Sequence, residues 1–222
     1  MDDQGQMPQI FHRSANTLSK VSIFGLLSLV VGLILLAIVI ARSGYTTRQE
    51  IFVEQPLQFS HMHHVTDDGI DCRYCHTSVE TSSFAGLPPT KTCMNCHAVL
   101  FANAAFLEPV RASFRDNKPL HWVRVHDLPD FVYFNHSIHI KKGVGCETCH
   151  GRIDQMPLTY QENSLLMEWC INCHKNPAPN LRPRSEITTM GYRPAVDQAI
   201  LGPQLMKEYN VNPPTSCSTC HR

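Results

Sequence analysis

The longest apolar segment of the chain lies near its N-terminus. Residues 21–41 read VSIFGLLSLVVGLILLAIVIA, a run of 21 uncharged residues between Lys20 and Arg42. As a helix rising 1.5 Å per residue, this run would be about 31 Å long, which matches a hydrocarbon core of about 30 Å. The alternative is a cleaved signal peptide, whose apolar region is usually shorter, about 7–15 residues. We therefore expect a transmembrane anchor helix at 21–42 after a short polar tail at 1–20.

The rest of the chain, residues 43–222, has weaker hydrophobic patterning. Ala98 to about Phe114 carries an apolar stripe at helical spacing, with Pro109 as a potential interruption. Residues 175–216 contain seven prolines and predict mostly loop. Little Leu, Ile or Val remains in this part of the chain to bury a core. We expect a mainly α fold with extensive irregular structure.

The cysteine content changes this picture. The chain has 10 Cys and 13 His in 222 residues, and every cysteine belongs to a C-x-x-C-H motif. This motif is the attachment signature of c-type haem, because two thiols reach the two vinyl groups of one porphyrin and the adjacent histidine ligates the iron. Motifs 1 to 5 are, in chain order, Cys72/Cys75/His76, Cys93/Cys96/His97, Cys146/Cys149/His150, Cys170/Cys173/His174 and Cys217/Cys220/His221.

Three other uses of paired cysteines fit less well. Zinc ribbons need two pairs for each metal ion and no histidine after each pair, whereas this chain has an odd number of pairs. A disulfide framework would not repeat the histidine, and thioredoxin-like chemistry expects one motif. We therefore predict five covalent haem c groups, with the five motif histidines as proximal ligands. The porphyrins would supply the missing core, in one haem domain at 43–222.

A second repeat supplies candidates for the distal iron ligands. The pattern F-x-H-x-x-H precedes motif 1 and motif 3, and another motif follows each of these two. This arrangement predicts two duplicated dihaem modules, about 57–97 and 132–174, with motif 5 at 217–221. Histidines three apart on a helix point in nearly the same direction but are displaced along its axis, so they suit two neighbouring haems. The predicted distal ligands are His61, His64, His136 and His139.

The fifth distal ligand is less clearly indicated. His126 is the first candidate, and Met167 is its main rival because it lies three residues before Cys170. A methionine ligand would raise the potential of its haem relative to haems with two histidine ligands. Met156 and His121 are weaker candidates. His63 breaks the repeated pattern and is expected to face solvent.

Charge bears on partners and orientation. The net charge is zero and no long basic run occurs, which argues against nucleic acid as a partner. Arg13 and Lys20 precede the apolar run and Arg42 and Arg48 follow it, so basic residues do not orient the helix. Haem c is attached on the outer side of bacterial membranes. We therefore expect a single-pass protein of the bacterial inner (cytoplasmic) membrane, with its N-terminus in the cytoplasm and its haem domain in the periplasm or on the outer face.

These motifs resemble two known groups. The F-x-H-x-x-H modules, over about 57–174, resemble class III multihaem cytochromes c of the c3/c7 type, in which the two histidines of a pair ligate different haems. Residues 69–97 (GIDCRYCHTSVETSSFAGLPPTKTCMNCH), 122–139 (WVRVHDLPDFVYFNHSIH) and 167–174 (MEWCINCH) are similar to the membrane-anchored pentahaem cytochrome c subunits of bacterial alternative complex III.

The second resemblance implies an electron-carrier subunit of a quinol-oxidising respiratory complex, not an enzyme by itself. It implies an iron–sulfur subunit and multi-span quinol-binding membrane subunits as partners. It also implies a periplasmic cytochrome, a copper protein or a terminal oxidase as the electron acceptor. Two alternatives stay open. One is a self-contained membrane-anchored quinol dehydrogenase feeding a periplasmic reductase, and the other is a multihaem reductase with one open iron.

Overall fold

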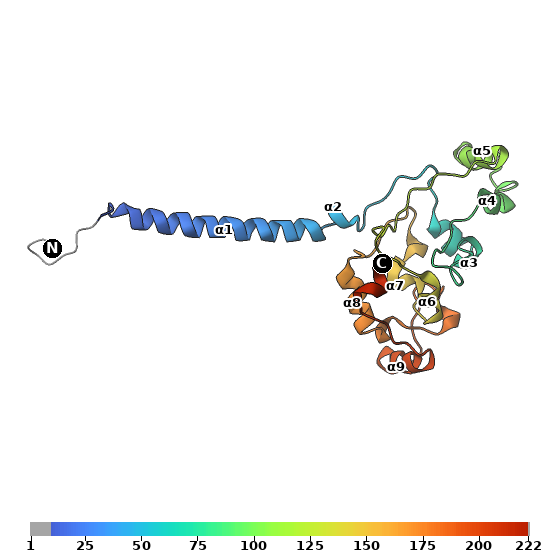
Figure 1. Cartoon of the computed structure of the whole chain (residues 1–222). Helices are drawn as coiled ribbons and strands as arrows, with labels where there is room; N and C mark the ends of the chain where they lie inside the picture. Colours follow the sequence, from blue (N-terminus) through green and yellow to red (C-terminus); the bar gives the residue numbers. More distant parts are fainter. Residues whose placement is uncertain (1–9, 222) are drawn as a thin grey trace, which may run out of the picture. The chain divides into compact units, whose positions relative to one another are not determined.

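The computed structural model describes residues 10–221, and the chain divides into two compact units, residues 1–47 and 48–222. In the first unit, α1 (Ser14–Arg42) is a helix of 29 residues without a buried side chain, followed by α2 (Gly44–Thr47) (Figure 1). Within the described residues, α1 is the one helix long and apolar enough to cross a membrane. It begins seven residues before the expected span, inside the segment predicted to be a polar tail. Positions 1–9 of that tail lie outside the described residues.

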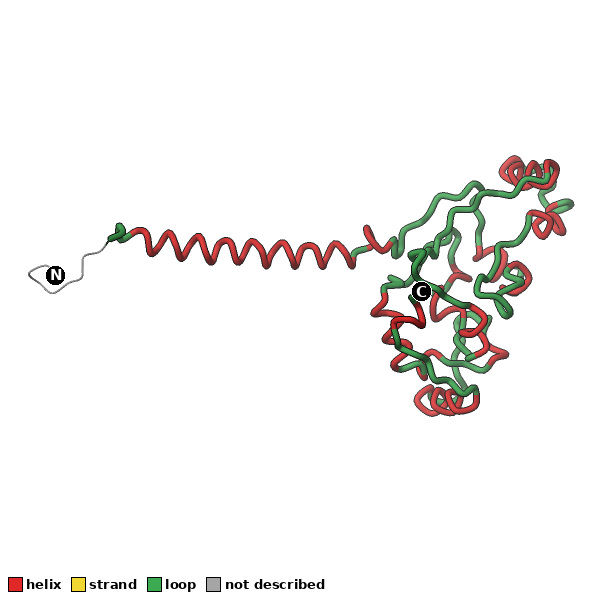
Figure 2. The backbone as a smooth tube through the Cα atoms, in the orientation of Figure 1, coloured by secondary structure: helices red, strands yellow, loops and turns green. Residues whose placement is uncertain are grey.

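The second unit consists of short helices joined by long loops, without a strand among the described residues (Figure 2). The mainly α, irregular fold predicted from the sequence is therefore confirmed. Four isolated β-bridges, Val132 to His221 among them, tie distant loops together. The α-helices are α3 (Cys72–Cys75), α4 (Thr90–His97), α5 (Glu108–Asp116), α6 (His136–Lys141), α7 (Cys146–His150), α8 (Met167–Lys175), α9 (Gln198–Glu208) and α10 (Cys217–Cys220). A π-helix, η1 (Met62–Asp67), and four 3-10 turns, Ala105–Leu107, Ile153–Gln155, Ala178–Asn180 and Arg184–Glu186, complete the unit.

The helix expected from Ala98 starts ten residues later, so that prediction was wrong at its N-terminal end. Phe101 has a left-handed backbone (φ 53°), which breaks any continuous helix after motif 2. The helix α5 begins at Glu108, and Pro109 lies in its first turn. Proline is tolerated there because the N–H groups of the first turn have no partner within the helix. Pro109 therefore starts this helix instead of interrupting it.

The proline-rich segment 175–216 is also more ordered than expected. It contains α9, in which the Asp197 carboxylate accepts a hydrogen bond from the Ala199 N–H at 2.9 Å. That N-terminal cap and the helical spacing of Leu201 and Leu205 outweigh the proline at position 203. Leu181, Leu205 and Tyr209 then form a small buried cluster. The prediction that this segment is mostly loop missed the cluster.

Conventional hydrophobic packing is sparse in this structure. Among the described residues, seven apolar side chains are buried: Leu107, Val110, Met156, Leu181, Ile187, Leu205 and Tyr209. Large apolar side chains of the second unit are instead exposed, including Val99 at 81% and Met167 at 68%. A polypeptide with so few buried apolar residues needs another source of stability, and the covalent haem groups predicted from the sequence would supply one.

Candidate haem-binding sites

All five C-x-x-C-H motifs lie on short helices. Each pair of cysteines spans about one helical turn in α3, α4, α7, α8 or α10, which brings its two sulfur atoms to the same side. The local sequence starts these turns: before α3, the Asp71 carboxylate accepts a hydrogen bond from the Arg73 N–H at 2.8 Å. None of the ten cysteines forms a disulfide, so all of them are available for covalent attachment to a porphyrin.

The motif histidines are oriented through their Nδ1 atoms. Four of the five place Nδ1 against a backbone carbonyl oxygen: His76 on Gly86 (2.7 Å), His97 on Leu100 (3.1 Å), His174 on Pro214 (2.7 Å) and His221 on Phe131 (3.2 Å). A carbonyl only accepts hydrogen bonds, so each of these Nδ1 atoms carries the proton and Nε2 keeps a free lone pair. This is the tautomer that iron ligation through Nε2 needs.

The distal candidates show the same feature in both modules. His64 places Nδ1 on the Ser60 carbonyl at 2.9 Å, and His139 places Nδ1 on the Asn135 carbonyl at 2.7 Å, four residues earlier in each case. Phe59 stacks on the His64 ring, with centroids 4.4 Å apart and planes at 24°. The phenylalanine of each F-x-H-x-x-H pattern thus stacks on the second histidine of the pair and holds its imidazole ring in place.

Two pairs of imidazoles have the separation expected across one iron. A metal–imidazole bond is about 2.0 Å long, so two rings on opposite faces of an iron have centroids about 6.2 Å apart. The observed centroid distances are 6.2 Å between His64 and His97 and 6.1 Å between His139 and His174. In each module the second histidine of the repeat therefore faces the second motif. The residues of both sites fit a haem with two histidine ligands.

The first histidines of the two repeats lie in a shared cluster with motifs 1 and 3. Burial lowers the pKa of His61 to about 4, and His76, His64 and His126 add to the shift. Burial also lowers the pKa of His150 well below its usual range, with contributions from His126, His136, His76 and His61. The cluster, named here the central histidine cluster, consists of His61, His76, His126, His136 and His150. His61 and His150 are therefore neutral at pH 7, as iron ligands must be.

The remaining candidates have different surroundings. His126 contacts His150, with His126 Nε2 and His150 Nδ1 at 3.2 Å, whereas the ring neighbour of His221 is Phe131. His63 is exposed and lies 3.4 Å from a carboxylate oxygen of Asp67, in agreement with its expected solvent-facing position. Met167 begins α8 with an exposed side chain.

The two modules also orient each other's histidines. His61 of the first module places Nδ1 2.9 Å from the Thr159 hydroxyl, in the second module. His136 of the second module places Nδ1 2.8 Å from the Ser83 carbonyl, in the first. These reciprocal contacts could not be predicted from either repeat alone, because they depend on how the modules pack.

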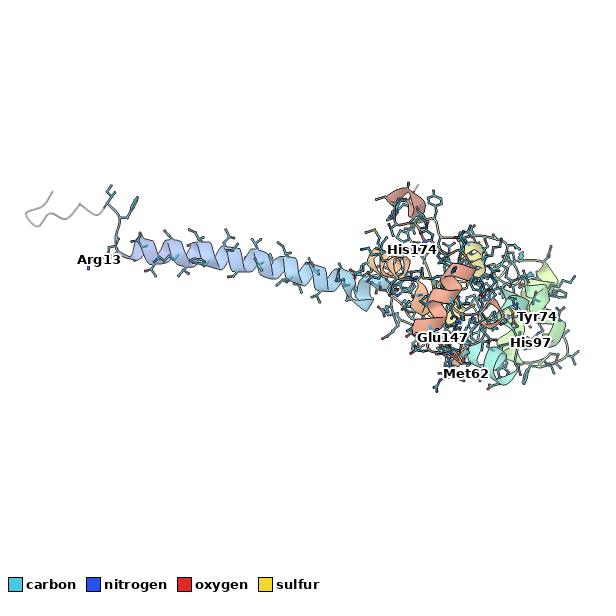
Figure 3. The ribbon with its side chains drawn as sticks, turned by 90° about the horizontal axis from the view of Figure 1, so that it is seen from below. Arg13, Met62, Tyr74, His97, Glu147 and His174 are labelled. Atoms are coloured by element: carbon cyan, nitrogen blue, oxygen red, sulfur yellow. The ribbon has the colours of Figure 1, made fainter. Side chains whose placement is uncertain are left out.

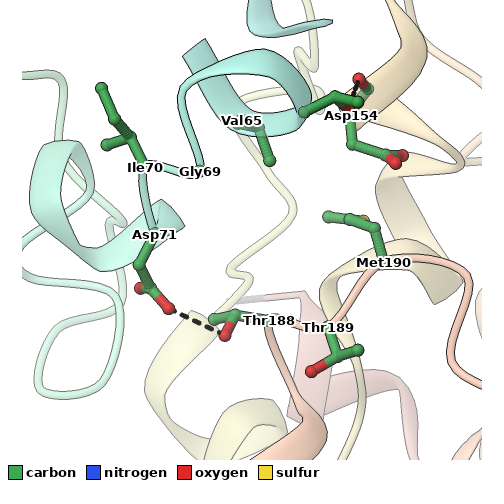
Figure 4. A pocket seen from close by; sticks show the side chains of 9 residues that line it. Val65, Gly69, Ile70, Asp71, Asp154, Thr188, Thr189 and Met190 are labelled. Carbon is green, nitrogen blue, oxygen red and sulfur yellow. Dashed lines mark hydrogen bonds between the residues drawn. The ribbon is translucent and has the colours of Figure 1, made fainter.

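A segment near position 190 joins motif 1 to motif 3. The Cys146 N–H donates to the Ile187 carbonyl at 3.0 Å, and the Thr188 hydroxyl donates to the Asp71 carboxylate at 3.0 Å. Figure 4 shows the second bond at the edge of a cavity of about 330 Å³. The segment therefore contacts the first cysteine of motif 3 and the residue before the first cysteine of motif 1.

The five motifs follow one another in space as a series, although not in chain order. The interaction between the thiols of Cys72 and Cys146 lowers the pKa of Cys72 and raises that of Cys146, and burial with nearby Cys173 and Cys170 raises the pKa of Cys149 to about 12. The Asn95 amide donates to the Tyr74 hydroxyl at 3.1 Å, and Figure 3 shows Tyr74 in the same region as His97. Neighbouring thiols along the series are Cys93 with Cys75, Cys72 with Cys146, Cys149 with Cys173, and Cys170 with Cys220. The spatial order of the motifs is therefore 2, 1, 3, 4, 5.

Two of the predicted haem-attaching cysteines are exposed, in contrast to the other eight, which are partly buried. They are Cys96 of motif 2 and Cys217 of motif 5. The sequence predicted a porphyrin core enclosed by short helices, and the polypeptide does not enclose these two thiols. The physical reason is their position, because motifs 2 and 5 are the two ends of the series and each has a neighbouring motif on one side only. The haem attachment of Cys96 and Cys217 stays a prediction from their motifs.

Comparison with known proteins identifies the family of the chain. The family model "Cytochrome c7 and related cytochrome c" matches residues 132–222, which cover the second module and motif 5. The chain is also 32% identical over 148 residues to the "Menaquinone reductase, multiheme cytochrome c subunit" of Nitratidesulfovibrio vulgaris, covering 55% of this chain and 69% of the relative. The chain belongs to this family of multihaem cytochrome c subunits. As a multihaem cytochrome c, it binds haem covalently and serves electron transfer.

Proposed function

We propose that the chain is the membrane-anchored electron-relay subunit of a quinone oxidoreductase complex and that it carries five covalent haems. The observation that carries this proposal is the spatial series of motifs 2, 1, 3, 4 and 5, in which thiols of consecutive motifs are neighbours. One-electron oxidation and reduction is the chemistry that the bound haems supply. In this series the two end positions, motif 2 and motif 5, are the places where partners deliver and collect electrons. The exposed thiols of Cys96 and Cys217 at these two ends support that assignment.

The polypeptide supports a relay by fixing its axial ligands. Hydrogen bonds from Nδ1 hold the imidazoles in one tautomer and one ring orientation, so each site changes little in geometry when its oxidation state changes. Ring pairs such as His64 with His97 would hold a haem iron from both sides, so a substrate would not bind to that iron. At motifs 2 and 4 these features favour an electron carrier over a multihaem reductase, which needs one open iron.

The finer assignment is to an alternative complex III type of respiratory complex, from the sequence segments at 69–97, 122–139 and 167–174. On this proposal the helix α1 anchors the chain in a bacterial inner membrane, with the N-terminus cytoplasmic and the haem domain periplasmic or on the outer face. An iron–sulfur subunit and multi-span quinol-binding subunits are its partners. A periplasmic cytochrome, a copper protein or a terminal oxidase receives the electrons.

The named relative supports a second candidate, in which electrons flow in the other direction. That relative is described as a subunit of a menaquinone reductase, so a related complex would pass electrons from a periplasmic donor to quinone. Both candidates use the same series of motifs. They differ in which partner reduces the chain.

Purification from membranes through a tag on this chain tests the proposal. We expect an intact mass that includes five haems, together with co-purifying iron–sulfur and multi-span subunits. Added quinol should reduce the haems of the complex but not those of the chain alone. Haem reduction by quinol in the isolated chain would overturn the subunit assignment in favour of a self-contained dehydrogenase. Turnover that runs from a reduced periplasmic carrier to quinone, and not from quinol to a carrier, would select the quinone-reducing candidate.

A further inference from the structure

One motif histidine is oriented differently from the other four. His76, His97, His174 and His221 each donate from Nδ1 to a backbone carbonyl oxygen. His150 instead places Nδ1 3.2 Å from Nε2 of another imidazole, that of His126. Because His150 ligates iron through Nε2, its Nδ1 carries the proton, and His126 Nε2 is the acceptor.

The geometry of this pair does not fit two ligands of one iron. The ring centroids of His126 and His150 are 4.3 Å apart with planes at 72°. Rings on opposite faces of an iron have centroids about 6.2 Å apart, as the pairs His64–His97 and His139–His174 do. His126 lies beside the proximal histidine, on the side of its Nδ1, and not across an iron from it.

Counting ligands in the central histidine cluster leads to the same result. Motifs 1 and 3 require four axial ligands, and the cluster contains five histidines. Two of these, His61 and His136, belong to the F-x-H-x-x-H repeats and have Nδ1 placed on Thr159 and Ser83. The fifth, His126, lies outside both repeats and is the one whose Nε2 is already in contact with a motif histidine.

The loop that carries His126 is held in place by the rest of the domain. The Gln55 side chain bonds the backbone of Val123 twice, donating to its carbonyl at 2.8 Å and accepting from its N–H at 2.9 Å. On the other side of His126, Asp127 pairs with Arg124 at 3.1 Å.

We propose that His126 is not an iron ligand but the positioning residue of the motif 3 site, where its Nε2 accepts the Nδ1–H of His150. An acceptor at this place fixes the ring of His150 and increases the basicity of its ligating nitrogen. A more basic ligand stabilises the ferric state, so His126 lowers the reduction potential of the haem held by motif 3. The proposal rests on the five-haem assignment made under the proposed function.

Two substitutions of His126 in the full-length holoprotein test this role. His126→Leu removes the acceptor, whereas His126→Gln offers a side-chain carbonyl in its place. His63→Gln is the matched control, because His63 is exposed and occupies a variable position of the F-x-H-x-x-H pattern. The measurements are the number of covalent haems, the spin state of the irons by EPR, and a potentiometric titration.

We expect five covalent haems and no new high-spin iron in either variant. In His126→Leu the reduction potential of one haem should rise by about 59 mV. For a one-electron couple, this rise means that the ratio of reduced to oxidised haem at a fixed potential increases about tenfold. His126→Gln should restore much of this shift, and His63→Gln should show none.

A new high-spin signal in both His126 variants would overturn the proposal, because it would identify His126 as an iron ligand. Unchanged potentials in His126→Leu would overturn it as well. Failure of the five-haem assignment would be recognised separately, as fewer than five haems in the unmodified chain and in the His63→Gln control. If His126→Leu does not assemble, His126→Gln still decides between ligand and acceptor through its spin state.

Discussion

The two predicted dihaem modules repeat the same local geometry on different backbones. In the first module, the ring centroid of Phe59 is 4.9 Å from that of His61, with ring planes at 86°, and 4.4 Å from that of His64, with planes at 24°. In the second module, the corresponding values for Phe134 are 4.7 Å and 88° to His136, and 4.5 Å and 29° to His139. Yet the first pair leads into the π-helix η1, whereas the second lies on the α-helix α6.

The difference has a cause in the sequence. The first histidine of the repeat precedes the next cysteine by 11 residues in the first module and by 10 in the second. A π-turn takes up one extra residue within a helix, and the Asp68 N–H accordingly bonds the His63 carbonyl five residues back at 3.0 Å. The comparison shows that the ring geometry, and not the helix type, is what the two modules share.

The strongest test of this equivalence is loss of the second histidine in each module. His64→Ala and His139→Ala should each convert one low-spin iron to high-spin, because each removes the imidazole facing one motif histidine. EPR of the two holoproteins measures this directly, with His63→Ala as the control. If only one variant produced a high-spin iron, the two modules would not be equivalent.

Removing one residue between the histidine pair and the next C-x-x-C-H motif should affect the two modules unequally. Deletion of Asp67 shortens η1 to the spacing of the second module, so we expect the first module to keep its ligands and the spin states of its irons. Deletion of Lys141 shortens α6 below that spacing and should cost its module a ligand. Haem content and visible spectra of the two variants provide the measurement. Equal damage in both would contradict the role assigned to the π-turn.

The modules also differ in how much conventional core supports them. Leu205→Ala, beside the second module, should destabilise the domain by about 2–4 kcal/mol because it leaves a cavity against Leu181 and Tyr209. Val110→Ala in α5 removes less buried surface, and we expect a loss of about 1–2 kcal/mol. Denaturant titration of the holoproteins compares the two. A larger effect of Val110→Ala would place the main polypeptide core on the other side of the domain.

The smallest effect is expected at the contact between motif 1 and the segment near position 190. Thr188→Val removes the hydrogen bond to Asp71, which is partly exposed, so the cost should be about 0.5–1 kcal/mol. Hydrogen exchange of the amides around Cys72 and Cys146 reports on this contact. Exchange that stays unchanged at both sites would show that the segment does not couple the two motifs.

Most of the correct predictions came from short sequence motifs. The C-x-x-C-H motifs and the F-x-H-x-x-H pairs each lie within a few residues, so their helical turns and ring arrangement follow from short-range geometry. The start of α5 at Glu108 and the helix α9 were missed, because prolines were weighed as interruptions when one begins a helix and the other is tolerated in one.

The arrangement between modules could not be predicted in this way. The placement of His61 on Thr159 links positions 98 residues apart, and His136 meets Ser83 across 53 residues. Counting histidines left His126 as a candidate for the fifth iron, whereas its contact with His150 depends on the path of a loop that no motif marks. The spatial order of the motifs, and with it the exposure of the cysteine Cys96 in an end motif, likewise arises from packing and not from their order in the chain.

The intact mass of the full-length chain purified from membranes tests the central claim most directly. A relay through all five motifs predicts one covalent haem at each C-x-x-C-H, and therefore five haem masses on a single polypeptide. A chain carrying four or fewer haems, with free cysteines remaining in any of the five motifs, would contradict it.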